Sequence, residues 1–160
     1  MAIRSTIRTA PDAEGVSQMS KVNALVIDDS GIMRKMVMRG LNEMAICEFE
    51  FAEAEDGADG LEKFDERNTD IIFVDWNMPN MDGMHMVRKL RARRERDDLP
   101  IVMVTTEKLT GKMEEALDGG VDTFISKPFT AENLKQRVGP LIERIQEEKS
   151  KGGFFKRLVS

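Results

Sequence analysis

The chain has 160 residues, which is enough for one folded domain with a sizeable hydrophobic core. Hydrophobic residues make up 41% and charged residues 33% of the chain, as in ordinary soluble globular proteins. The formal net charge of −5 argues against a general binder of nucleic acid or anionic membranes, since both attract proteins through positive potential. No apolar run approaches the roughly 20 residues that cross a bilayer, and the single cysteine, Cys47, excludes an internal disulfide. We therefore expect a cytoplasmic protein without stable membrane insertion.

The two ends of the chain differ in composition from the middle. Residues 1–20 lack a continuous apolar stretch and are predicted to form a flexible leader, not a secretory signal. Residues 21–148 carry the regular pattern of one folded domain. In the C-terminal tail, residues 149–160, Gly152 and Gly153 precede a short apolar and basic peptide. This tail is either a disordered terminus or a docking peptide for a partner protein.

Apolar runs and apolar residues spaced three and four apart alternate along the chain. The runs predict five strands, at residues 24–27, 48–54, 71–74, 101–104 and 121–126. A first helix is expected after Ser30, a good N-cap residue. Its expected apolar face comprises Met33, Met36, Val37, Gly40, Leu41 and Met44. Further helices are predicted at 58–64, 84–94 and 112–117 and from residue 130 onward, where Gly139 and Pro140 kink the last helix or delay its start.

This alternation predicts an α/β fold with a doubly wound, mostly parallel sheet of five strands, because each crossover must return along the sheet. The basic residues between Arg88 and Arg96 lie in and just after the helix predicted at 84–94. We interpret them as a solvated helix face and not as a nucleic-acid site, since Asp97 and Asp98 follow directly.

Chemically reactive residues gather where the predicted strands end. They are Asp28, Asp29, Asp75, Thr105 and Lys127. In a parallel sheet ligands bind outside the carboxyl ends of the strands, so these five side chains are expected to share one edge. Carboxylates crowded there repel one another, and Mg²⁺ with its oxygen ligands relieves that repulsion. A metal, a carboxylate, a hydroxyl and a lysine together are typical of a phosphoryl-transfer site.

Four motifs in order resemble those of the receiver family of two-component signalling, and of chemotaxis response regulators in particular. They read VIDD at 26–29, DWNMPNMDG at 75–83, VTTE at 104–107 and KPF at 127–129. The resemblance covers residues 21–146 and implies the (βα)5 flavodoxin-like receiver fold.

The resemblance also implies a role for each site residue. Asp75 matches the phosphoacceptor. Asp29 and Asp75 match direct Mg²⁺ ligands, with the backbone carbonyl of Asn77 as a third ligand and Asp28 acting through water. Lys127 matches the lysine that contacts the acyl phosphate and is expected to precede Pro128 through a cis peptide bond.

The remaining roles concern switching. Thr105 matches the hydroxyl that moves toward the phosphoryl group, and Phe124 the aromatic side chain whose rotamer follows it. That aromatic residue is often Tyr in the family, whereas this chain contains no Tyr. Asn77 and Glu107 occupy the positions that tune the lifetime of the phosphorylated state.

The implied function is that of a stand-alone response regulator. A histidine kinase of the chemotaxis type donates the phosphoryl group, and an output protein, with the flagellar motor switch as the implied candidate, binds the region formed by residues 112–117, 121–126 and the helix from 130. An aspartyl-phosphate phosphatase is a further expected partner. A phosphorelay or phosphate-sink receiver remains open as an alternative. A haloacid-dehalogenase-type phosphatase is disfavoured because Asn77 stands where such enzymes carry a proton-shuttling carboxylate, and the intact site residues disfavour a pseudo-receiver.

Overall fold

The computed structural model describes residues 21–66, 68–93, 97–106 and 112–159, with side chains as far as residue 152. Its five strands are β1 (Val22–Ile27), β2 (Phe49–Ala54), β3 (Ile71–Val74), β4 (Ile101–Thr105) and β5 (Thr123–Ser126). They form one parallel sheet in the order β2-β1-β3-β4-β5. This is the flavodoxin-like order, so the predicted fold class is confirmed.

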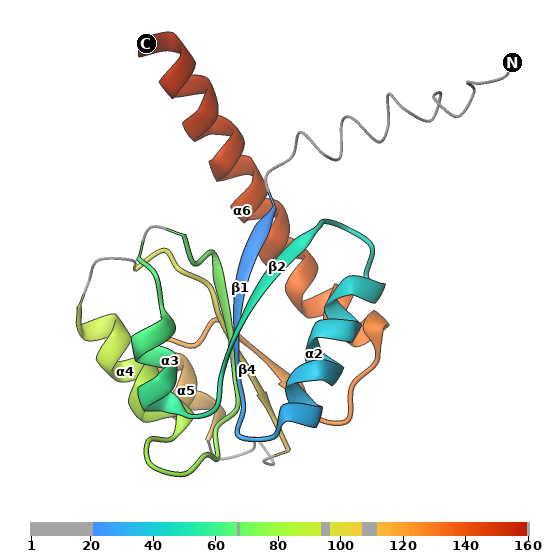
Figure 1. The fold of residues 1–160 in the computed structure, drawn as a ribbon, viewed down its shortest axis with the longest axis vertical. Coiled ribbons are helices and arrows are strands. Elements are labelled where there is room, and N and C mark those ends of the chain that lie inside the picture. Colours follow the sequence, from blue (N-terminus) through green and yellow to red (C-terminus); the bar gives the residue numbers. More distant parts are fainter. Residues whose placement is uncertain (1–20, 67, 94–96, 107–111, 160) are drawn as a thin grey trace, which may run out of the picture.

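Helices cover both faces of the sheet (Figure 1). The helices are α2 (Gly31–Glu43), α3 (Gly57–Lys63), α4 (Gly83–Ala92), α5 (Met113–Asp118) and α6 (Ala131–Val159). Helices α2 and α6 lie on one side and α3, α4 and α5 on the other, as expected for right-handed crossovers whose direction along the sheet reverses once, after β2 (Figure 1).

Two hydrophobic cores result, one on each face of the sheet. Successive side chains of a strand point to opposite faces, so Ile71 and Phe73 of β3 pack toward α2 and α6, whereas Ile72 and Val74 pack toward α4. The central strands are buried on both faces, which explains why their sequences are continuous apolar runs.

Helix α2 begins as predicted, with the Ser30 hydroxyl accepting a hydrogen bond from the Met33 amide at 3.2 Å. The expected apolar face is wrong at Met36, which is 44% exposed, because the buried stripe runs through Val37 and Leu41 and turns Met36 outward. At Gly40 a Cβ atom would lie 2.6 Å from the Leu134 side chain, so a glycine here permits close packing of α2 on α6.

Helix α6 begins at Ala131, where Thr130 and Asn133 cap it reciprocally through hydrogen bonds of 3.1 and 3.2 Å. The expectation that Gly139 and Pro140 delay the helix start is therefore wrong. The helical backbone also continues through residues 149–159, the segment expected to form a tail, and protrudes beyond the sheet (Figure 1). Within the described residues, no helix combines the length and the apolar character that crossing a bilayer requires.

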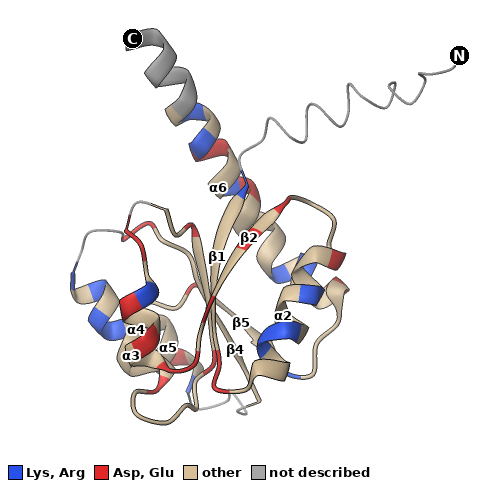
Figure 2. Ribbon diagram, viewed as in Figure 1, with Lys and Arg blue, Asp and Glu red and all other residues tan. Residues whose placement is uncertain are grey.

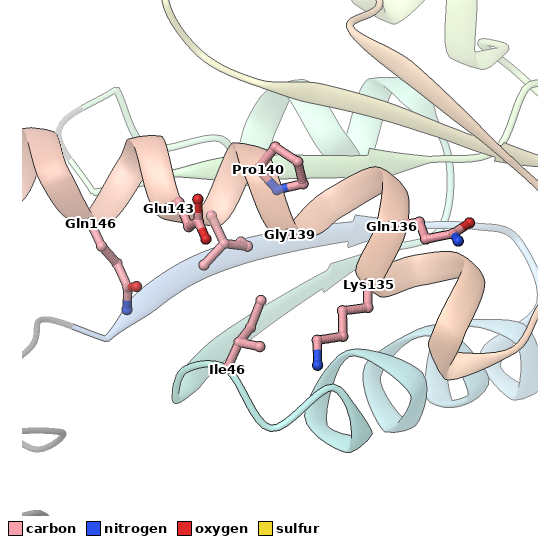
Figure 3. A pocket seen from close by; sticks show the side chains of 8 residues that line it. Ile46, Lys135, Gln136, Gly139, Pro140, Glu143 and Gln146 are labelled. Carbon is pink, nitrogen blue, oxygen red and sulfur yellow. The ribbon is translucent and has the colours of Figure 1, made fainter.

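A groove of about 440 Å³ runs along α6 (Figure 3). Ile46 forms one wall, and the helix around Pro140 forms the other, with Lys135, Glu143 and Gln146 along its length. None of its lining residues follows the carboxyl end of a strand, so the groove is separate from the edge where the candidate site lies.

Candidate functional site

The carboxyl ends of β1 and β3 bring three acidic side chains together. Oxygen atoms of Asp28, Asp29 and Asp75 all lie within 4.8 Å of one another. The acidic segment at the end of β1 directly precedes α2 (Figure 2). Because parallel strands end at a common edge, residues far apart in the sequence meet here, as the sequence predicts. We call this group, with Thr105 and Lys127, the acidic edge.

Lys127 places a buried cation among these carboxylates. Its ammonium nitrogen lies 2.7 Å from Asp28 Oδ2 and 3.2 Å from Asp75 Oδ2, and its side chain is only 7% exposed. The Lys127–Pro128 peptide bond is cis, as expected. One lysine faces three carboxylates, so the acidic edge keeps an excess of negative charge that suits a further cation.

Asp75 is the carboxylate most affected by its surroundings. Burial raises the pKa of Asp75 above its ordinary value, and the negative charge of Asp28 adds to that shift. The positive charge and hydrogen bond of Lys127, together with a hydrogen bond from Thr105, act in the opposite direction. A cation bound at the acidic edge would therefore stabilise the ionised form of Asp75.

The chemistry of the acidic edge fits a hard divalent ion. Mg²⁺ prefers oxygen ligands and binds through one or two carboxylates while keeping several waters. Asp29 is exposed and makes no hydrogen bond or ion pair within the part of the chain that the structure describes, so its carboxylate is available. The side chain of Asn77, the third residue of the β3–α4 loop, is likewise exposed.

The two switch candidates are both buried. Thr105 ends β4 with no exposed surface, and its carbonyl accepts a hydrogen bond from the Lys127 amide at 3.0 Å. The ring of Phe124 on β5 is 6% exposed and belongs to the core beneath α4 and α5. Glu107, the other candidate for tuning phosphoryl lifetime, lies outside the described residues.

Hydrogen bonds that were not predicted from the sequence hold the loop after Asp75 against the start of α3. Asp56 caps α3 through the Asp59 amide at 2.8 Å, and its second oxygen accepts a hydrogen bond from the Asn80 side chain at 2.8 Å. The Gly57 amide also bonds to the Met81 carbonyl at 3.0 Å. The hydrogen bonds from the Asp59 amide, which contributes most, and from Asn80 lower the pKa of Asp56. An Asp-Gly pair in a sequence is typical of a turn, but its pairing with Asn80 depends on how two loops meet.

Trp76, next to Asp75, is a second feature of this loop. Its ring is buried, and the Lys112 ammonium lies 5.1 Å from the ring centroid. This cation–π contact joins the β3–α4 loop to the residues just before α5. The single tryptophan of the chain is therefore placed to report changes at the acidic edge.

Comparison with known proteins agrees with this geometry. The sequence profile of the response regulator receiver domain matches residues 24–139. The chain is 36% identical over 121 residues to the chemotaxis protein CheY of Pseudomonas aeruginosa, covering 76% of this chain and 96% of that protein. It is 38% identical over 115 residues to CheY1 of Helicobacter pylori strain J99, covering 71% and 91%. A crystal structure of the chemotaxis protein CheY4 of Vibrio cholerae superposes with a TM-score of 0.66 at 33% identity, covering 76% and 99%.

The chain therefore belongs to the response-regulator receiver family. Within that family it is homologous to the CheY chemotaxis proteins. Receiver domains are regulatory phosphoacceptors and not conventional enzymes. The acidic edge at the carboxyl ends of the strands agrees with such a role, because it contains an acidic side chain, Asp75, beside a lysine.

Proposed function

We propose that this chain is a phosphorylation-controlled switch in which Asp75 accepts a phosphoryl group from a histidine kinase. The observation that carries the proposal is the placement of the Lys127 ammonium, 2.7 Å from Asp28 and 3.2 Å from Asp75. An ammonium group in this position can contact the Asp75 carboxylate before transfer and an oxygen of the attached phosphoryl group after it.

The proposed metal site uses two carboxylates of the acidic edge. Asp29 and Asp75 would bind Mg²⁺ directly, with the Asn77 carbonyl as a third ligand and Asp28 acting through water. The indirect role of Asp28 is supported by its contacts, since one carboxylate oxygen accepts from the Ser30 amide at 2.9 Å and the other from Lys127. The ion would supply positive charge that offsets the repulsion between Asp75 and an incoming phosphoryl group.

In the proposed transfer, a carboxylate oxygen of Asp75 forms a bond to phosphorus while the nitrogen–phosphorus bond of the kinase phosphohistidine breaks. Lys127 then donates a hydrogen bond to a phosphoryl oxygen, and the Thr105 hydroxyl donates another after moving toward it. Phe124 is proposed to follow Thr105 inward, while Asn77 and Glu107 set how long the phosphorylated state lasts.

Exposed apolar side chains support the proposed partner surfaces. Among the described residues the large exposed hydrophobic side chains form two pairs with helical spacing of four. Met113 and Leu117 lie on α5, which supports an output face formed by α5, β5 and α6. Ile32 and Met36 lie on α2, which starts two residues after Asp29, and support docking of the kinase there.

The output protein we propose is a flagellar motor switch component, because the matched relatives are chemotaxis proteins. The alternative is a relay or phosphate sink, in which Asp75 passes its phosphoryl group to another histidine. An affinity capture with beryllofluoride- and Mg²⁺-loaded protein against metal-free protein separates the two. Recovery of a motor component with the beryllofluoride-loaded protein alone supports the switch, and recovery of a histidine phosphotransfer protein supports the relay.

The phosphoacceptor is tested by incubating the protein with acetyl phosphate and Mg²⁺ and measuring its intact mass. We expect one hydroxylamine-labile phosphoryl group on Asp75, its loss in Asp75→Asn, and its retention in Asp70→Asn. A phosphoryl group mapped to another side chain would refute the proposal.

A further inference from the structure

Arg34 is the one basic side chain of α2 that reaches back to the strand edge among the described contacts. Its Nη1 atom donates to the backbone carbonyl of Asp28 at 2.5 Å, and its Nε atom donates to Glu53 Oε1 of β2 at 2.7 Å. The Arg34 side chain is 18% exposed, so the guanidinium is held between the β1–α2 turn and the neighbouring strand.

The Asp28 carbonyl belongs to the peptide unit that leads into Asp29. The other polar atoms of Asp28 are also engaged, in hydrogen bonds with Ala54, Ser30 and Lys127. The direction of the exposed Asp29 side chain therefore depends on the orientation of this peptide, because no contact of its own fixes it within the described residues.

We infer that Arg34 is a positioning residue of the acidic edge, which orients the Asp28–Asp29 peptide so that the Asp29 carboxylate points at the cation position. The planar guanidinium suits this role, because it donates to a carbonyl and a carboxylate at once in a fixed geometry. Glu53 anchors the outer side, and its own carbonyl accepts a hydrogen bond from Lys63 at 3.0 Å. This inference rests on the proposed metal site.

Arg34 could instead act by its charge, and the two roles predict different results for Arg34→Lys. A positive charge near three carboxylates weakens the binding of any divalent ion, and Arg34→Lys keeps that charge, so this role predicts unchanged dissociation constants. A lost orientation weakens binding, and it weakens Mg²⁺ more than Ca²⁺, because Mg²⁺ demands near-ideal octahedral geometry whereas Ca²⁺ tolerates irregular sites.

The test is the dissociation constants of Mg²⁺ and Ca²⁺ for the full chain, measured by calorimetry and by Trp76 fluorescence. For Arg34→Lys, which keeps the charge but loses the fork, we expect Mg²⁺ to bind about tenfold more weakly and Ca²⁺ to change less than about threefold. Glu53→Ala, on the exposed side of the edge strand, is expected to weaken Mg²⁺ in the same direction by about threefold.

The matched control is Arg88→Lys, the same chemical change at an exposed ion pair between α4 and α5, where Arg88 and Glu115 lie 2.8 Å apart. Both dissociation constants should stay within about twofold of those of the unsubstituted protein. Unchanged Mg²⁺ binding in Arg34→Lys and Glu53→Ala, or equal shifts for both ions, overturns the positioning role alone. Failure of the unsubstituted protein to bind Mg²⁺ overturns the metal site as well.

Discussion

The two edges of the sheet use the same kinds of side chain to opposite effect. At the carboxyl edge, one lysine faces three carboxylates whose oxygens lie within 4.8 Å of one another. At the amino edge the charges are matched. Asp70 accepts from Lys149 at 2.7 Å and from the Asn23 amide at 2.8 Å.

Arg91 makes a second set of hydrogen bonds at the amino edge. Its guanidinium donates to the carbonyls of Leu99 and Gly120 at 2.7 and 2.8 Å and pairs with Asp122 at 3.2 Å. The contrast teaches that charge density alone does not mark a binding site. A binding site is indicated by buried charges of one sign that the protein does not balance, because a ligand of opposite charge is needed to stabilise them.

The largest expected effect is at the amino edge. Arg91→Met should lower the free energy of unfolding by about 3 kcal/mol, because it leaves the Leu99 and Gly120 carbonyls without their donor. Urea unfolding measures this loss. The affinity for Mg²⁺, measured by calorimetry on the folded variant, should be unchanged, and a tenfold loss of it would mean that the two edges are coupled.

Ligand binding should distinguish the edges next. Mg²⁺ at 100 times its dissociation constant should raise the free energy of unfolding by about 2.7 kcal/mol, since the proposed site forms only in the folded chain. Thermal unfolding with and without Mg²⁺ checks this. In Asp29→Asn the rise should shrink, whereas in Asp70→Asn it should persist, and an equal response of both variants would contradict the contrast.

The sequence predicted the fold and the acidic edge for one physical reason. Strands buried on both faces are continuous apolar runs, and the residue after each run must lie at the same edge of a parallel sheet. Asp75 and Lys127 are 52 positions apart, yet their meeting follows from that rule alone.

Contacts that depend on how two surfaces meet could not be predicted from the sequence. The pairing of Asp56 with Asn80 and of Arg34 with Glu53 requires the geometry of loops and of an edge strand. Met36 has the spacing of a buried residue, but its exposure depends on how far α2 is rotated against the sheet. Arg91 lies in a basic cluster that indicated a solvated face, whereas it is half-buried against four backbone and side-chain acceptors.

Replacing Asp with Asn should change the free energy of unfolding in opposite directions at the two edges. Asp75→Asn should raise the free energy of unfolding of the metal-free protein at pH 7 by about 1 kcal/mol, because it removes a buried charge that Asp28 repels while Lys127 keeps its bond to Asp28. Asp70→Asn should lower it by about 1 kcal/mol, since Lys149 then loses its ion pair. If urea unfolding showed changes of the same sign for both variants, the charges at the two edges would be balanced to the same degree.

The smallest effect is the pH dependence of that difference, and its direction follows from the pKa of Asp75. Burial raises this pKa in the folded state, so the folded chain holds the proton more tightly than the unfolded chain. The ionised group therefore opposes folding above its folded pKa, and the opposition fades as the pH falls through that pKa toward the ordinary value of about 3.9. The advantage of Asp75→Asn should accordingly be full at neutral pH and approach zero near pH 4, as measured by urea unfolding of the metal-free proteins across this range. An advantage that grew on acidification would mean that Lys127 outweighs burial, and that the acidic edge is as well matched as the amino edge.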